Sequence, residues 1–319
     1  MFPADTLSPD LRRRNQVHAV RLSELTTMRI GGPATLVILE DRRDLPELLA
    51  LPHRWLGRGA NLLVGDLGVP EIVIKLGAAF DTISLGAPVD GRALVKVGAG
   101  YDLARLIAAT VKAGLAGPEG LAGVPATIGG ALRMNAGTST CWTIDWVTRV
   151  EVLLPNETTP RWLEHKDLPV AYRSSGLPVG TLFLSAEMSL ATGDPEQLRA
   201  TSVRLKQAKA ASQPLALPSA GCMFKNPSPT CPAGKLIDEL GLKGQRVGGA
   251  EISQVHANFI VNPQRTATVA DVTALVRRIR CAAWTQRQIV MELEVETWNC
   301  PAELHAHPET LLEAGACLR

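Results

Sequence analysis

The sequence has no long apolar run, no paired cysteine motif and no large excess of charge of either sign. None of its apolar stretches reaches the roughly 18 to 20 residues that cross a bilayer, and residues 1–20 lack the apolar centre of a signal peptide. The six cysteines form no CxxC pair, which removes the usual zinc layouts. Without secretion signals they also predict no disulfide framework. We therefore expect a cytoplasmic protein with no membrane partner and no bound metal.

The balance of charge argues against a protein that mainly binds nucleic acid. Lys and Arg total 33 and Asp and Glu total 31, so the formal net charge is only +2. A local pocket for an anion is still compatible with this balance. The chain has 319 residues, of which 46% are hydrophobic and 20% charged. That length and composition predict a folded protein of two or three domains.

Short apolar runs alternate with helical patterns through about residue 190, which predicts an α/β or α+β unit. The expected strands are 35–39, 71–75, 94–97, 149–154 and 181–184, and the expected helices are 45–51, with Asp44 as its N-cap, and 102–112. A connector at 194–219, with a polar helix at 196–211, leads to a second unit. There we expect helices at 233–240 and from Thr268 onward, a strand at 256–262, and a strand at 290–298 that alternates Glu292, Glu294 and Glu296 on one face.

Glycine is concentrated in a few loops. The segments 57–61 and 98–103 each contain GxG but lack the third glycine of a dinucleotide fingerprint, so tight turns explain them equally well. The stretch 118–137 is richer in glycine, with hydroxyl and amide side chains between the glycines. Because glycine is a costly way to build a structural element, this stretch predicts backbone N–H groups that approach a ligand such as a pyrophosphate and a flat ring. A P-loop is excluded because no GxxxxGK[ST] occurs.

Six motifs stand in the order typical of one enzyme family: GRGANLLV at 57–64, GLAGVPATIGGA at 120–131, YRSS at 172–175, PSAGCMFKNP at 218–227, AGKLI at 233–237 and HANFIVN at 256–262. With these motifs the chain resembles the UDP-N-acetylenolpyruvoylglucosamine reductases (UDP-N-acetylmuramate dehydrogenases) from about residue 24 to 298. The resemblance is to the shorter branch of the family, because no insertion carries the tyrosine that covers substrate in the other branch. Only two tyrosines are present, Tyr101 and Tyr172.

The resemblance implies an α+β fold: a vanillyl-alcohol-oxidase/PCMH-type FAD-binding module of two α+β subdomains, followed by a C-terminal α+β substrate-binding domain. We place the FAD-binding subdomains at 1–75 and 76–195, the substrate-binding domain at 196–300 and a C-terminal tail at 301–319. NADPH would pass hydride to N5 of a bound FAD. The reduced flavin would then reduce UDP-N-acetylglucosamine enolpyruvate to UDP-N-acetylmuramate for peptidoglycan synthesis. The resemblance also implies a monomer whose partner is this small-molecule substrate.

The residues implied in these roles follow from matching positions in the motifs. FAD would be contacted along the glycine loops by Gly57, Arg58, Gly59, Ala60, Asn61, Leu62, Gly120, Ala122, Gly123, Val124, Pro125, Thr127, Ile128, Gly129, Gly130, Asn135, Ala136 and Gly137. Substrate would be contacted by Tyr172, Arg173, Gly221, Lys225 and Asn226, and the catalytic residues would be Arg173, Cys222 and Glu294.

Two points within this set stay open. Cys222 stands where the family usually has the serine that protonates the enolate, and 138–140 differs from most relatives. A thiol with an ordinary pKa of about 8.5 is mostly protonated at pH 7 and is a stronger acid than an alcohol, so it can do this work. Arg173 suits a carboxylate because its planar fork stays charged. The glutamate stays open between Glu294 and Glu296, because a two-residue slip of the alignment selects Glu296 instead of Glu294.

Three alternatives compete with the reductase. A diverged, non-catalytic flavin or nucleotide-sugar binding protein of the same fold would explain the altered positions. A hydrolase using Cys222 and His256 would need a thiolate, the opposite tuning of the thiol, although a structural role for His256 is favoured. A flavin oxidase of the same superfamily would react with oxygen in place of an enol ether.

Overall fold

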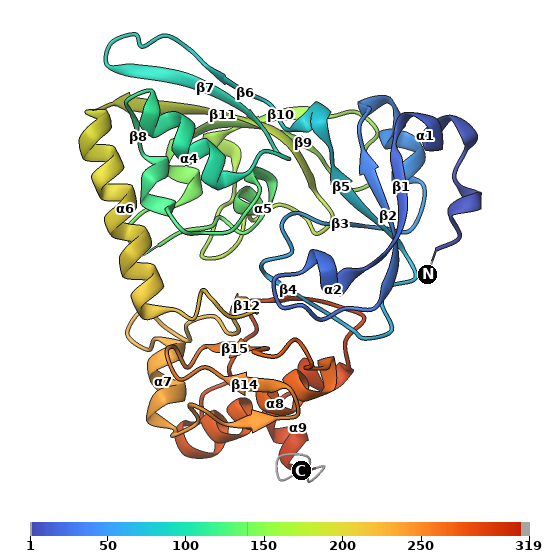
Figure 1. The fold of residues 1–319 in the computed structure, drawn as a ribbon, viewed down its shortest axis with the longest axis vertical. Coiled ribbons are helices and arrows are strands. Elements are labelled where there is room, and N and C mark those ends of the chain that lie inside the picture. The colour runs from blue at the N-terminus through green and yellow to red at the C-terminus, as the bar shows by residue number, and fades with distance from the viewer. Residues whose placement is uncertain (1, 139, 314–319) are drawn as a thin grey trace.

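A computed structural model describes residues 2–138 and 140–313. Within them the chain forms sheets of four, six and four strands and one further two-stranded pair. Figure 1 shows the first two sheets side by side in the upper part of the molecule, with the third sheet and its helices below them. Position 139, which lies within the altered segment 138–140, is outside the described residues, as is the tail beyond residue 313.

The first sheet has the strand order β1-β2-β5-β3. Its strands are β1 (Gln16–Arg21), β2 (Pro33–Leu39), β3 (His53–Trp55) and β5 (Ile72–Leu76), and α1 (Pro9–Arg14), α2 (Leu22–Leu25) and α3 (Leu45–Leu49) lie between or beside them. β1 pairs antiparallel with β2, whereas β2 and β3 pair parallel with β5. The predicted strands 35–39 and 71–75 are confirmed. The apolar residues Val37, Ile72 and Ile74 are fully buried between this sheet and its helices.

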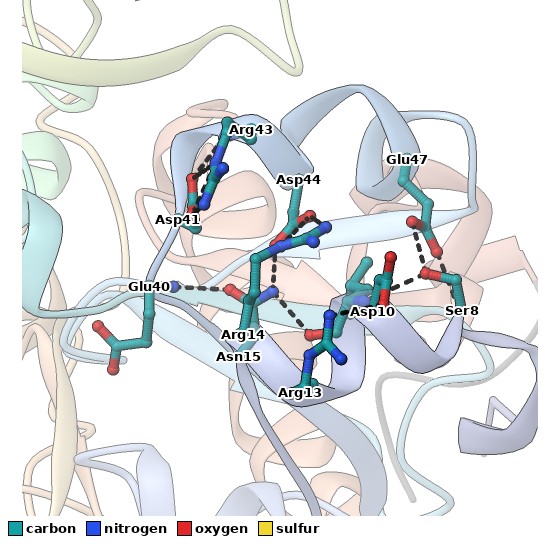
Figure 2. Close-up of polar contacts among 11 residues, drawn as sticks. Ser8, Asp10, Arg13, Arg14, Asn15, Glu40, Asp41, Arg43, Asp44 and Glu47 are labelled. Atoms are coloured by element: carbon teal, nitrogen blue, oxygen red, sulfur yellow. Dashed lines mark hydrogen bonds and ion pairs between the residues drawn. The ribbon is translucent and has the colours of Figure 1, made fainter.

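A polar network fixes α1 against the start of α3, and it corrects the expected role of Asp44 (Figure 2). Asp44 was expected to cap α3. It lies instead inside a preceding helical turn that Asp41 caps through the Arg43 N–H group. The Asp44 carboxylate therefore points toward α1, where it accepts hydrogen bonds from the Arg14 guanidinium and, at 2.6 Å, from the side-chain amide of Asn15.

The six-stranded sheet runs β10-β9-β11-β7-β6. Its strands are β6 (Ile83–Leu85), β7 (Arg92–Gly98), β9 (Val147–Leu153), β10 (Arg161–Glu164), β11 (Leu182–Thr192) and the short β8 (Leu115–Ala116), which pairs with β11. All its pairings are antiparallel. The strand predicted at 181–184 is only the first third of β11. Helices α4 (Leu103–Lys112) and α5 (Ile128–Arg133) pack their apolar side chains against this sheet. The helix predicted at 102–112 is confirmed as α4, which Asp102 caps.

The long helix α6 (Pro195–Ser212) leads from the six-stranded sheet to the C-terminal part of the molecule (Figure 1). The third sheet there has the order β12-β15-β14-β13. Its elements are β12 (Ser219–Cys222), β13 (Arg246–Val247), β14 (Ala250–Ile252), β15 (Phe259–Val261), α7 (Ala233–Glu239), α8 (Val269–Arg287) and the later α9 (Pro308–Glu313). The reciprocal Thr268–Asp271 capping box expected from the sequence begins α8.

The strand expected at 290–298 is wrong for its first half. Only β16 (Glu296–Trp298) is regular, and it pairs parallel with β4 (Leu62–Val64) of the N-terminal part. The chain bends at Val295. Because of this bend the even-numbered glutamates do not share one face, as strict alternation would require. Among the described residues no helix has the length and apolar character to span a membrane.

Candidate functional site

The loop 57–61 is built to face a ligand with its backbone. It follows β3 and leads into β4, and Gly59 takes a positive φ of 65°. None of its five N–H groups donates a hydrogen bond to another described residue. Buried or half-buried N–H groups are normally paired, so a run of free ones is a partly positive surface for an anion. The Thr27 hydroxyl fixes the loop to β12, because it lies 2.7 Å from the Ser219 carbonyl oxygen and 3.3 Å from that of Gly59.

The second glycine segment packs beside this loop. Thr127 caps α5 through the Gly130 N–H group, and a Cβ added to Gly57 would lie 2.9 Å from the Thr127 hydroxyl. The N–H groups of Ile128 and Gly129 donate to carbonyl groups of the β7–α4 turn. Among the predicted FAD contacts, these amides of the second segment are therefore already used. Other N–H groups of the second segment, those of Gly123, Thr127 and Gly137, donate to no described residue and are free for a ligand, as are those of the loop 57–61.

Arg173 lies at the tip of a two-residue turn, between Ala171 and Ser174, whose N–H and C=O groups pair with each other. Its φ is 57°, which a residue with a long side chain rarely adopts. The guanidinium lies 5.2 Å from the Tyr172 ring centroid and 5.6 Å from that of Trp142, and it donates a 3.1 Å hydrogen bond to the Gly137 carbonyl. A strained backbone and three contacts hold this cation in one place.

Glu294 is the acidic partner of Arg173. Its Oε1 lies 2.8 Å from Arg173 Nε, and its side chain is only 12% exposed. Burial raises the pKa of the Glu294 carboxyl, and the Arg173 charge partly offsets that rise. Asn61 holds the segment in place, because its side-chain amide donates to the Glu294 carbonyl at 3.0 Å. Glu296 is exposed and lies near the Trp298 indole, so the structure selects Glu294 as the glutamate beside Arg173.

Cys222 ends β12 close to this ion pair. Burial raises the pKa of its thiol to about 12, and the Glu294 charge adds to the rise, while Arg173 and Lys209 oppose it. At neutral pH the thiol is therefore protonated, a state that suits a proton donor and not a nucleophile. Gly221, with a positive φ of 81°, turns the chain just before it.

The remaining predicted substrate contacts are placed less centrally. Lys225 lies 3.5 Å from Glu292 with its side chain 39% exposed, and the Asn226 Oδ1 accepts the Ala233 N–H group at the start of α7. Tyr172 is 44% exposed and packs edge-on against Trp142, with the ring centroids 6.0 Å apart.

Sequence reasoning missed two residues at this site. Lys209, in the last turn of α6, is half-buried, has no carboxylate partner among the described residues and packs on Gly123. Burial lowers the pKa of its amine; the Cys222 thiol opposes this effect and the Arg173 charge adds to it. Asn258 holds the segment that follows β12, because its side chain accepts from the Phe224 N–H group and donates to the Phe224 carbonyl. Lys209 lies on a polar helix that gave no signal, whereas Asn258 lies within the HANFIVN motif at 256–262 but was given no role.

Comparison with known proteins places the chain among relatives with one name. The UDP-N-acetylenolpyruvoylglucosamine reductase of Thermus thermophilus is 41% identical over 283 residues, which cover 89% of this chain and 99% of that protein. The chain belongs to the UDP-N-acetylenolpyruvoylglucosamine reductase family. The Deinococcus radiodurans reductase is 38% identical over 288 residues, covering 89% of this chain and 96% of its own length.

The family assignment extends over both halves of the molecule. The C-terminal domain of UDP-N-acetylenolpyruvoylglucosamine reductase matches residues 213–298, and an FAD binding domain matches residues 33–162. The crystal structure of the reductase from Thermus caldophilus aligns with a TM-score of 0.78 at 40% identity, covering 89% of this chain and 99% of that one. The resemblance stated from the motifs, the α+β fold with an FAD-binding module, and the class of flavin-dependent oxidoreductase are thereby confirmed.

Proposed function

We propose that this reductase reduces UDP-N-acetylglucosamine enolpyruvate to UDP-N-acetylmuramate with NADPH as hydride donor, and that Arg173, Cys222 and Glu294 carry the second half of the reaction. One observation carries the assignment of roles: a buried arginine–glutamate pair lies beside a protonated thiol, next to a loop of free N–H groups. As a precursor enzyme of peptidoglycan synthesis, it would act in the cytoplasm as a monomer.

The residues of the two glycine segments fit FAD. The five free N–H groups of the loop 57–61 would bind its phosphates, because nothing else in the described structure satisfies them. The second segment and the turn at Asn135–Gly137 would border the ring system. When bound, the flavin takes hydride from NADPH and supplies it to the carbon–carbon double bond of the substrate.

Arg173 would bind the carboxylate of the enolpyruvyl group. Its planar guanidinium can donate two parallel N–H hydrogen bonds to a carboxylate. Its turn and its aromatic neighbours hold the guanidinium in one position, so that only a correctly placed substrate can make both bonds. When this carboxylate binds Arg173, it neutralises part of the guanidinium charge, so that Arg173 stabilises the ionised form of Glu294 less strongly. Since that charge is what restrains the rise in the Glu294 pKa, the glutamate then takes up a proton. A protonated Glu294 can donate a hydrogen bond to the enolate that forms when hydride arrives.

Cys222 would supply the single proton that the enolate carbon needs. The thiol S–H bond breaks, the new C–H bond forms, and the thiolate is left beside Arg173 and Lys209, the two cations that lower its pKa. Because burial favours the protonated thiol, these two cations are needed to stabilise the thiolate that proton donation leaves behind. Solvent then returns the proton to sulfur before the next turnover.

The sheets suggest how the chain divides. We propose FAD-binding subdomains at 1–75 and 76–195, a substrate-binding domain at 196–300 and a tail at 301–319. The first boundary falls one residue before the end of β5, and the second falls after the first residue of α6. The second boundary thus leaves α6, apart from Pro195, with the substrate-binding domain.

Separating the two half-reactions tests the proposal. An anaerobic visible spectrum of the FAD-loaded protein should bleach on addition of NADPH and return on addition of UDP-N-acetylglucosamine enolpyruvate. In Cys222→Ala we expect normal bleaching and a return slowed by about 10²- to 10⁴-fold, the usual contribution of a general acid. Cys222→Ser, the matched variant, should keep substantial turnover.

Other outcomes point to other functions. Bleaching without return in the unaltered protein would keep the flavoprotein and discard this substrate. Rapid reoxidation by oxygen alone would indicate an oxidase, and a protein that binds flavin without being reduced would indicate a non-catalytic binding protein. Loss of both half-reactions in Cys222→Ala with flavin still bound would remove Cys222 from the role of acid.

A further inference from the structure

A cleft of about 420 Å³ lies behind the segment that carries Glu294. It is bounded by α8, by residues 292–297 and by the turn at Leu304 and His305. Of the segment 292–297, Glu294 is the one residue that does not line the cleft, since it points toward Arg173 instead. The cleft is thus separate from the proposed reaction centre, and the two sites lie on opposite sides of the segment 292–297.

The floor of the cleft holds a buried cation without a counter-charge. Arg280, on α8, is 6% exposed, and its Nη1 donates a 2.6 Å hydrogen bond to the Leu304 carbonyl. Its Nε has no hydrogen-bond partner, and no carboxylate pairs with it in the part of the chain that the structure describes. A buried guanidinium normally pairs with an anion, because removing it from water is costly. Arg280 is therefore a buried cation at the cleft whose charge no described carboxylate neutralises.

The rim of the cleft carries charge of the opposite sign. Glu292, whose side chain is 71% exposed, and Glu296 both line it. Glu292 has one weak partner, Lys225, at 3.5 Å. The Thr297 hydroxyl lies 2.8 Å from His305 Nε2 on the same wall and adds further hydrogen-bonding capacity. A simple anion would meet repulsion from two carboxylates at the rim, and a simple cation would meet Arg280 at the floor.

We propose that this cleft binds a small zwitterion, an amino acid or a dipeptide, with its carboxylate on Arg280 and its ammonium group between Glu292 and Glu296. The volume is large enough for either ligand. The arrangement gives each end of the ligand a partner of opposite charge, and the carboxylate supplies the counter-charge that Arg280 lacks among the described residues.

Binding to the FAD-loaded protein is measured by calorimetry with three probes: glycylglycine, acetate and ethylammonium. We expect saturable binding of glycylglycine in the millimolar range or tighter, and at least tenfold weaker binding of each single-charge probe. Arg280→Met should weaken glycylglycine at least tenfold. Arg278→Met, the same change two residues earlier on α8, is the matched control and should change it less than twofold.

A rim variant keeps the test decisive if Arg280→Met does not fold. Glu292 is largely exposed, so Glu292→Gln should fold normally, weaken glycylglycine and leave acetate unchanged or slightly tighter. Absence of saturable binding overturns the proposal. So does equal binding of acetate and glycylglycine, which would mean a site for a bare anion, and so does equal loss in the Arg278 and Arg280 variants.

Discussion

The protonation state of the Cys222 thiol gives the most direct test of the proposed chemistry. Burial and the nearby Glu294 charge raise the pKa of its thiol from its ordinary value near 9 to about 12. A rise of about three units leaves about a thousandfold less thiolate at pH 8 than an unperturbed thiol has. Since only the thiolate reacts with iodoacetamide, Cys222 should be alkylated very slowly at that pH.

The shape of the pH dependence separates this effect from simple shielding. Poor access to a buried thiol lowers the alkylation rate by the same factor at every pH. A raised pKa instead makes the rate climb tenfold per pH unit through pH 10, whereas the rate of a small reference thiol with an ordinary pKa bends at about pH 8.5 to 9 and levels off above that pH. The rate at Cys222 is followed by mass mapping of its peptide in the FAD-loaded, substrate-free protein.

One result would refute the reasoning. If the pH profile of Cys222 alkylation bends at or below about pH 9 and levels off by about pH 10, the thiol ionises in the ordinary range and is not held protonated by its surroundings. The acid of the second half-reaction would then have to be sought elsewhere, and the nucleophilic interpretation would regain support. Replacing Glu294 by Gln removes one cause of the raised pKa, so in that variant the plateau should move to lower pH.

Three further predictions concern the ion pair and the N-terminal network. Arg173→Lys should slow reoxidation of the flavin by the enol ether about a hundredfold with bleaching by NADPH unchanged, because an ammonium lacks the paired donors; an unaltered rate in stopped flow would take Arg173 out of the site. Glu294→Gln should slow the same step by a similar factor while Glu296→Gln should not, and equal effects would contradict the placement of Glu294. Asp44→Asn should lower the free energy of unfolding by about 2 kcal/mol at pH 7 in urea titrations, because it weakens charge-assisted bonds with Arg14. Since pairing lowers the Asp44 pKa, this difference should shrink only when the pH falls below about 4, and a difference that persists at pH 2 would contradict its electrostatic origin.

Local signals in the sequence were reliable where neighbouring residues decide the outcome. The cap at Thr268 depends on Asp271, three residues away, and it was predicted correctly. The helix at 102–112 was also predicted, although Asp102 caps α4 and is not its first residue. Asp44 has the same residue type before a similar apolar pattern, yet it pairs with α1 instead. Its partner Arg14 lies 30 positions earlier, and no local pattern contains that information. β1 was missed because it alternates polar residues at a sheet edge and has no apolar run.

The proposed site shows the same limit. Motifs indicated Arg173, Cys222 and Glu294, but the choice of Glu294 over Glu296 needed the bend at Val295. Strict alternation of side chains assumes a regular strand. The segment 292–295 is not a regular strand, and it passes between the proposed reaction centre and the cleft behind it. Lys209 could not be found from the sequence, since it lies on a polar helix that becomes partly buried only when the C-terminal part folds against the glycine loops.

The hydrogen bond from Asn61 to the Glu294 carbonyl joins residues 233 positions apart in the chain. At a synthesis rate of about 5 to 20 residues per second, the loop 57–61 leaves the ribosome roughly 10 to 50 seconds before the glutamate that it holds. During that interval a growing chain can complete the first two sheets and its flavin-facing loop while its acidic partner does not yet exist. Finished chains and chains interrupted before Glu294 should therefore differ in catalysis far more than in flavin binding.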